Sequence, residues 1–209
     1  MKKIVIWKDP YDAGFDLCKK RTIQIKEGVT ILVGCNGIGK STLLHNIKEQ
    51  LKKEKTKFIE YDNLHDGGLQ STSLAGYMGE MDFLVTSISS SEGENIVMNI
   101  GKQASKMGAY VKKYSDQEEY WFLLDAIDSG LSIDNIVDIK KYLFDVVIDD
   151  NKDKKVYIIV SANEYELCNG ENCLDVYHGK YVRFADYDEY RKFILDSKQW
   201  KEYREDNIK

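Results

Sequence analysis

The sequence of 209 residues contains a single proline, no Ser/Gly-rich linker and no internal repeat. Such tracts mark domain boundaries and repeat arrays, so their absence favours one domain. The net charge of -5 excludes a global electrostatic attraction to nucleic acid or to an anionic membrane, and such contacts would need a local basic patch. The sequence also lacks a signal-peptide pattern and an apolar run long enough to span a bilayer. We therefore expect a cytoplasmic protein with no direct membrane insertion.

Cysteine is scarce as well, with four residues at irregular positions: Cys18, Cys35, Cys168 and Cys173. The segment CNGENC lacks the two-residue spacing and the second pair that a structural zinc site needs. We expect reduced thiols throughout, and a loop that carries two of them at CNGENC.

Short apolar runs alternate with longer segments of helical periodicity, which is typical of an α/β protein with a mostly parallel sheet flanked by helices. Strands are predicted at 2–7, 22–26, 29–33, 57–61, 120–125 and 156–161. Helices are predicted at 40–53, 94–109 and 134–149. The segment DVYHGKYVRF predicts a hairpin with its turn at His178–Gly179, followed by a helix over 187–203.

The segment ILVGCNGIGKSTLL begins as a buried strand and ends as a helix. Between the two, Gly34, Gly39, Lys40 and Ser41 satisfy the pattern GxxxxGK[ST]. Glycines allow backbone N–H groups to turn inward around phosphate oxygens, and the start of the helix adds its dipole. In this motif the lysine reaches the β- and γ-phosphates and the serine hydroxyl binds Mg²⁺. The predicted nucleotide-binding residues of this loop are Gly34, Asn36, Gly37, Gly39, Lys40, Ser41 and Thr42.

The form GCNGIGKST resembles the GxNGxGKST loop of the ABC ATPase superfamily, which includes transporter cassettes and SMC-type ATPases. The resemblance implies a P-loop fold of ABC type, ATP and Mg²⁺ as ligands, and further motifs in a fixed order. It covers most of the chain and is strongest with small stand-alone cassette proteins of bacteria and phages. It also implies one ATP-binding domain over 1–209, with 62–112 as a reduced helical lid that carries the family signature.

The family signature, LSGGQ or a relative such as LSxGE, has a counterpart in SSSEGENIVMNIGKQ. Ser91, Gly93 and Glu94 match it, while Ser90 stands at the leucine position. A serine followed by a helix start can bind an anion. In the family this helix start binds the γ-phosphate that a second subunit holds, so the resemblance implies a head-to-tail dimer.

The acidic strand YWFLLD ends at Asp125, which is expected to hold Mg²⁺ together with Ser41. The following residues, DAIDSGLS, align with the family pattern DExxSGLD. The resemblance implies that Ser129 belongs to a loop that crosses to the second subunit. Ala126 stands where the family has the glutamate that polarises water. Asp128 is an alternative base. Asn163 stands where the family has its switch histidine, near the end of the next strand. Unlike a histidine side chain, the asparagine amide cannot take a proton and become positively charged.

Lys40, Asp125 and Asn163 are the predicted catalytic residues, in a site that lacks both water-activating groups of the family. Two further roles follow from the resemblance. Tyr11 is placed to stack on adenine, although an exposed turn tyrosine explains it nearly as well. Gln70 is the candidate lid glutamine that contacts Mg²⁺, with Asn63 and His65 competing for that role.

The leading interpretation is an ATP-dependent homodimer with slow or absent hydrolysis that presents a surface to an unknown protein partner. A transporter cassette pairing with separate membrane subunits is one alternative, although it would keep the missing glutamate and histidine. A small P-loop kinase with Asp62 as base is another, although four arginines provide no Arg-rich lid. Nucleic-acid binding is weakly supported by a basic run at the end of the first predicted helix: Lys48, Lys52, Lys53, Lys55 and Lys57.

Overall fold

The computed structural model describes residues 1–6, 20–62 and 92–206. In chain order the elements are β1 (Lys2–Val5), β2 (Thr22–Ile25), β3 (Gly28–Val33), α1 (Lys40–Lys53), β4 (Ile59–Asp62), α5 (Glu92–Lys113), β5 (Glu119–Asp125), α6 (Ile133–Ile139), η1 (Lys140–Asp145), α7 (Val146–Asp149), β6 (Lys155–Ser161), α8 (Tyr165–Cys168), β7 (Asn172–Asp175), β8 (Lys180–Val182) and α9 (Tyr187–Asp206).

The main sheet has six strands in the order β4-β5-β6-β3-β7-β8. The first five strands pair in parallel and β8 pairs antiparallel with β7, which confirms the expected α/β class with a mostly parallel sheet. Strands β1 and β2 form a separate antiparallel pair. Strand β6 lies between β3 and β5, so the residues that follow these three strands meet at one edge of the sheet. That edge is where open parallel sheets bind their ligands.

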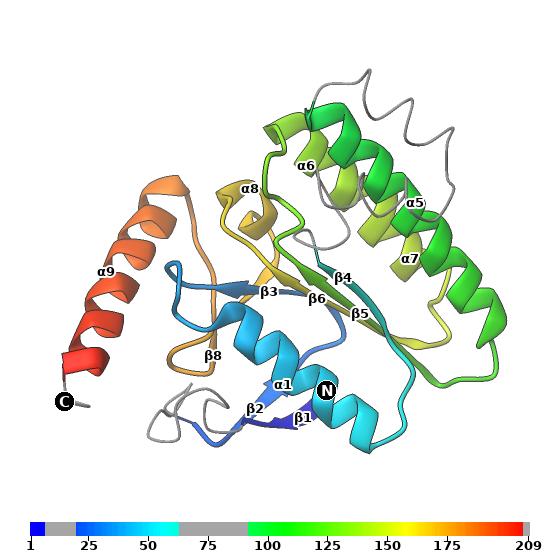
Figure 1. The fold of residues 1–209 in the computed structure, drawn as a ribbon, viewed down its shortest axis with the longest axis horizontal. Coiled ribbons are helices and arrows are strands. Elements are labelled where there is room, and N and C mark those ends of the chain that lie inside the picture. The colour runs from blue at the N-terminus through cyan, green and yellow to red at the C-terminus, as the bar shows by residue number, and fades with distance from the viewer. Residues whose placement is uncertain (7–19, 63–91, 207–209) are drawn as a thin grey trace, which may run out of the picture.

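Side chains alternate across the sheet because successive strand residues point to opposite faces. On β5, Phe122 and Leu124 belong to the core beneath α5, α6 and η1, whereas Trp121 and Leu123 belong to the core shared with α1, β1 and β2. Helix α1 lies on one face of the sheet and α5 to α7 on the other (Figure 1). Burial on both faces explains why β5 reads as a continuous apolar run.

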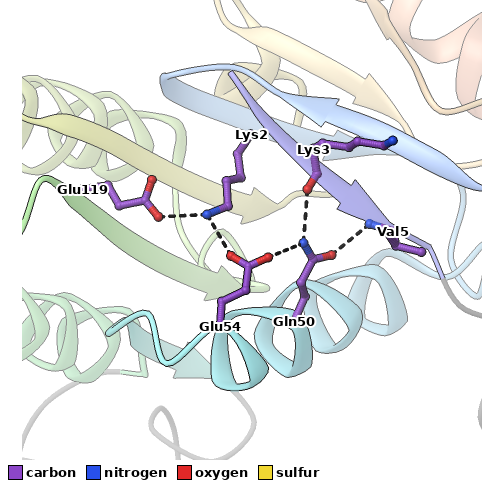
Figure 2. Close-up of polar contacts among 6 residues, drawn as sticks. All are labelled: Lys2, Lys3, Val5, Gln50, Glu54 and Glu119. Carbon is purple, nitrogen blue, oxygen red and sulfur yellow. Dashed lines mark hydrogen bonds and ion pairs between the residues drawn. The ribbon is translucent and has the colours of Figure 1, made fainter.

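A polar cluster fixes the end of α1 against the β1 strand (Figure 2). The Gln50 amide donates to Lys3 O at 3.1 Å and accepts from Val5 N at 2.9 Å. It therefore pairs with β1 as a peptide group of a neighbouring strand would. Lys2 Nζ lies 2.8 Å from Glu54 and 3.1 Å from Glu119. Burial alone would lower the Lys2 pKa, but the hydrogen bonds to these two carboxylates outweigh it and raise the pKa.

The helix predicted over 134–149 is present as three consecutive pieces, α6, η1 and α7, of which η1 is π-helical. Lys140, the first residue of η1, donates from Nζ to Glu166 O at 3.1 Å and to Asn169 O at 2.6 Å. These contacts attach the helix to the segment that contains α8, beyond the end of β6.

The C-terminal hairpin is confirmed, but its first strand begins earlier than expected. Strand β7 starts at Asn172, inside CNGENC, so Cys173 lies in a strand and Cys168 ends α8. The interpretation of this segment as a loop was therefore wrong, because parallel pairing with β3 extends the sheet into it. Cys35, Cys168 and Cys173 are buried free thiols. The pKa of the Cys168 thiol is raised, mainly by its hydrogen bond with Cys173 and secondly by burial.

The predicted lid lies only partly within the described residues, because 63–91 fall outside them. Helix α5 is longer at both ends than the predicted helix 94–109. Its second half packs against the sheet, with Met107 and Tyr110 buried in the core. Burial raises the pKa of Tyr110 to about 12.

Candidate functional site

A pocket of about 240 Å³ lies at the carboxyl edge of the main sheet, where β3, β5 and β6 end. It is lined by residues from four segments: Asn36, Gly37, Gly39, Lys40, Ser41 and Thr42 from the loop after β3 and the start of α1, Asp125 and Ala126 at the end of β5, Ser161 at the end of β6, and Asn163 beyond it. The fold thus brings together residues that are up to 127 positions apart in the chain, from Asn36 to Asn163.

The loop between β3 and α1 (residues 34–39, the glycine loop) needs its glycines. Gly37 and Gly39 have φ angles of 74° and 111°, in the left-handed region that side chains disfavour. Gly34 has φ of 143°, and a Cβ built on it would lie 2.8 Å from Ile38 Cγ2. Gly34 does not line the pocket. Its role is in the turn beneath the loop, where its carbonyl accepts a hydrogen bond from Lys40.

The Lys40 side chain folds back onto the glycine loop and bonds to its backbone carbonyl groups. Its Nζ donates to Gly34 O at 2.8 Å and to Cys35 O at 3.4 Å, and the residue is only 8% exposed. Burial lowers its pKa, and the negative charges nearby, among them Asp128 and Asp125, oppose that shift. An ammonium held in this way is directed toward the centre of the loop, where an anion would lie.

Helix α1 begins at the pocket without a side-chain cap on its first turn. The first N–H groups of a helix have no partner within the helix, and they carry the positive end of its dipole. Lys40, Ser41 and Thr42 supply these groups and all three line the pocket. A 14-residue helix in this position is suited to binding an anion.

Asp125 and Ser161 form the opposite wall. Ser161 Oγ donates a short hydrogen bond to Asp125 Oδ1 and accepts one from Ala126 N at 3.0 Å. The serine therefore fixes both the carboxylate and the residue after it. Ala126 has φ of 51°, so the chain turns sharply at this point. Its side chain is a methyl group, which offers the pocket neither a proton acceptor nor a charge.

Asp128 holds the loop that carries Asn163. It is 2% exposed, and its Oδ2 accepts hydrogen bonds from the backbone N–H groups of Asn163 and Glu164 at 2.6 and 2.7 Å. Burial raises the pKa of the Asp128 carboxyl, while these two backbone bonds act in the opposite direction. Tyr190 donates from its hydroxyl to Asn163 O at 2.6 Å. Asn163 is therefore fixed on both sides of its backbone, and Asp128 acts as a support and does not line the pocket.

A second pocket of about 360 Å³ adjoins the first and shares Ser41 and Asp125 with it. Its remaining lining residues come from α1, β4 and β5: Leu44, His45, Lys48, Glu60, Tyr61, Asp62 and Leu123. Asp62 pairs with Asp125 in the parallel register of β4 and β5, so two carboxylates stand side by side at the edge of the sheet.

The remaining predicted site residues are not among the described residues that line the pocket of about 240 Å³. Tyr11, Gln70 and Ser91 lie outside the described residues, as do the competing candidates Asn63 and His65. Gly93 and Glu94 are in the first turn of α5. Ser129 is exposed on the turn after β5 and does not line either pocket.

The residues that line the pocket fit a nucleotide phosphate chain with Mg²⁺. Glycines leave room for phosphate oxygens against the backbone, and a serine hydroxyl with a carboxylate forms the oxygen donor set that Mg²⁺ prefers while keeping several waters. Within the described part of the chain, no group of three or more His, Cys, Asp or Glu side chains could hold a metal. None of the described helices is both long and apolar enough to cross a bilayer.

Sequence reasoning missed Ser161 and the residues of α9 at this site. Ser161 follows an apolar strand without any motif of its own, and only the pairing of β5 with β6 brings it to Asp125. Ser197 of α9 accepts a hydrogen bond from Cys35 N at 2.8 Å. Nothing in the periodicity of α9 indicates which residue of that helix reaches the glycine loop.

Comparisons with known proteins add no assignment to this geometry. No protein-family model matches the chain, and no curated protein matches it.

Proposed function

We propose that this protein binds Mg-ATP in the pocket of about 240 Å³ and acts as an ATP-dependent homodimeric switch that hydrolyses ATP slowly or not at all. The observation that carries the proposal is the composition of that pocket. The glycine loop, the uncapped start of α1, Lys40, Ser41 and Asp125 surround one space, as the sequence motifs predict for a nucleotide site of ABC ATPase type.

Each wall of the pocket has a separate role in binding. The N–H groups at the start of α1 and the Lys40 ammonium would hold phosphate oxygens. Ser41 and Asp125 would hold Mg²⁺, which would neutralise charge on the phosphates. Ser161 keeps the Asp125 carboxylate in position for this task.

Slow hydrolysis follows from what the pocket lacks near the phosphates. Ala126 presents a methyl group where the family places its base, and Asn163 can hydrogen-bond water but cannot hold a positive charge. Asp128 does not line the pocket, and two backbone N–H groups occupy its Oδ2. Loss of a positioned general base reduces rates by about 10²–10⁴-fold. A site that binds ATP without consuming it quickly can hold one conformation for long periods.

The test is molar mass by light scattering without nucleotide, with Mg-ADP and with Mg-ATP, with phosphate release assayed on the same samples. The expected result is a dimer that forms only with Mg-ATP and persists while little phosphate is released. A monomer under all three conditions would contradict the dimeric switch, and the absence of nucleotide binding would contradict the whole proposal.

A matched pair of variants in the same assay tests the assignment of Ala126. Ala126→Glu places a carboxylate at that position and should raise phosphate release by about tenfold or more. Ala126→Gln has nearly the same shape but no basic group, so it should remain as slow as the wild type. Equal rates in the two variants would show that the position does not serve the attacking water.

A phosphoryl transferase is the second candidate, favoured by the pocket of about 360 Å³ beside Ser41 and Asp125. Asp62 lines this pocket and could take the proton of a hydroxyl acceptor. For this function, the protein would remain a monomer with Mg-ATP and would release ADP only when a hydroxyl-bearing acceptor is added. Removal of the carboxylate by Asp62→Asn would then abolish ADP release while leaving ATP binding intact.

A further inference from the structure

Helix α9 contacts two of the segments that form the pocket of about 240 Å³, the glycine loop and the segment at Asn163. Tyr190, Ile194, Ser197 and Lys201 follow one another at helical spacing and so share one face of the helix. Tyr190 bonds to Asn163 O, and Ser197 Oγ accepts from Cys35 N in the glycine loop at 2.8 Å. The glycine loop turns toward α9 (Figure 1).

Lys201 continues this face to the tip of the glycine loop. A Cβ built on Gly37 would lie 2.8 Å from Lys201 Nζ and 3.3 Å from its Cε, so the end of the lysine side chain already lies against Gly37. Gly37 is one of the residues that line the pocket.

The position of Lys201 is fixed by its neighbours on α9. Ser197, one turn earlier, is 1% exposed and donates to Ile194 O while it accepts from the glycine loop. Trp200 packs against the turn of the β7–β8 hairpin, with ring centroids 4.6 Å from His178 and 5.9 Å from Tyr177. The helix therefore cannot move away from the loop without breaking the buried contacts of Ser197 and the half-buried ring contacts of Trp200.

The residues that line the pocket supply too little positive charge to balance the phosphates of a bound nucleotide. Of the described residues that line it, only Lys40 and Asp125 belong to charged residue types, and their formal charges are opposite and cancel. The phosphates of ATP carry more negative charge than one Mg²⁺ neutralises. Gly37 is exposed and Lys201 is half-buried, so a second ammonium at Gly37 would offset part of that excess at the open rim of the pocket.

We propose that Lys201 is a second cationic residue of the nucleotide site, supplied by α9, that binds the phosphates of the bound nucleotide. This inference rests on the proposed nucleotide-binding function. It assigns a binding role to a residue far from every nucleotide motif in the sequence.

The experiment measures Mg-ATP and Mg-ADP affinity by titration calorimetry for the wild type, Lys201→Gln, Lys201→Arg and Lys192→Gln, at low and at high salt. Lys192 is the matched control because it is exposed and lies nine residues earlier, on the opposite side of the same helix. Lys40→Ala reports whether the pocket binds nucleotide at all. Thermal unfolding without nucleotide reports whether the variants keep the fold.

Lys201→Gln should weaken binding of both nucleotides by roughly tenfold, the typical effect of losing a hydrogen bond to a charged group. Lys201→Arg should retain most of the affinity, and Lys192→Gln should bind like the wild type. The difference between the wild type and Lys201→Gln should shrink at high salt, because salt screens charge interactions.

Two outcomes separate the inference from the function on which it rests. If Lys40→Ala abolishes binding while Lys201→Gln binds like Lys192→Gln, Lys201 has no role at the phosphates and the inference fails alone. A wild type that binds neither nucleotide removes the proposed function itself. A loss of affinity in Lys201→Gln that is the same at both salt concentrations would indicate a structural contribution and would also overturn the inference.

Discussion

At the scale of single residues, Asp128 shows how a support residue differs from a catalytic one. The sequence offers it as an alternative base. The structure buries it and uses one of its oxygens for two backbone N–H groups of the loop around Asn163. Within the described residues, its Oδ1 has no hydrogen-bond partner, so this carboxylate is solvated poorly on one side.

The raised pKa of Asp128 predicts a specific pH dependence of stability. Because the folded-state pKa lies above the ordinary value of 3.8, the folded state binds the proton more tightly than the unfolded state does. The ionised carboxylate therefore lowers the free energy of unfolding as pH rises through the interval between these two pKa values. Asp128→Asn keeps an acceptor oxygen and carries no charge, so its stability relative to the wild type should increase with pH across that interval and then level off.

Urea unfolding at a series of pH values measures this effect. Asp150→Asn is the control, because Asp150 is exposed at the end of α7. A stability difference between Asp128→Asn and the wild type that is the same at every pH would contradict the prediction.

At the scale of elements, the two ends of α1 have different roles. Its N-terminal residues line the pocket, and its C-terminal half is attached to β1. Gln50 makes this attachment by pairing with the backbone of β1 at Val5 and Lys3 (Figure 2). Its amide also donates to Glu54 at 2.7 Å, which links it to the ion pairs of Lys2. The helix that begins at the pocket is thus held through a side chain ten positions away from Lys40.

Gln50→Ala should lower the free energy of unfolding by about 1–2 kcal/mol, because two backbone groups of β1 lose their partner and each hydrogen bond contributes roughly 0.5–1.5 kcal/mol. Denaturant unfolding measures the loss. Glu49→Ala, at the adjacent position on the same helix, should stay close to the wild type, since its exposed ion pair with Lys52 is local. Equal losses in the two variants would show that the pairing with β1 contributes nothing.

At the scale of the whole molecule, the proposed dimer depends on residues that the single chain does not use at its own pocket. Ser129 is exposed on the turn after β5 and lines neither pocket, as expected for a residue that would act on the partner subunit.

Ser129→Arg should therefore abolish the ATP-dependent dimer and leave nucleotide binding by the monomer nearly unchanged. Light scattering and calorimetry on the same preparation measure the two properties separately. Ser115→Arg is the control, because Ser115 is exposed before the start of β5, at the opposite edge of the sheet. Loss of both dimer and nucleotide binding in Ser129→Arg would argue against a role between subunits.

The sequence by itself determined the α/β class of the fold, the residues of the glycine loop, and the residues at which β3, α1, β5 and β6 end. Short continuous apolar runs indicate buried strands, and the GxxxxGK[ST] pattern indicates a glycine-rich turn between a strand and a helix. Both signals are properties of local sequence. Helix α1 occupies the predicted 40–53, and β5 ends at Asp125 as predicted.

Only the tertiary structure decided the order of the strands and which residues surround the pocket. The insertion of β6 between β3 and β5 brings Ser161 to Asp125, and the packing of α9 brings Ser197 to Cys35 and Lys201 to Gly37. These contacts join residues far apart in the chain. Local propensity and motif spacing contain no information on such pairings, because they are determined by how the whole core packs.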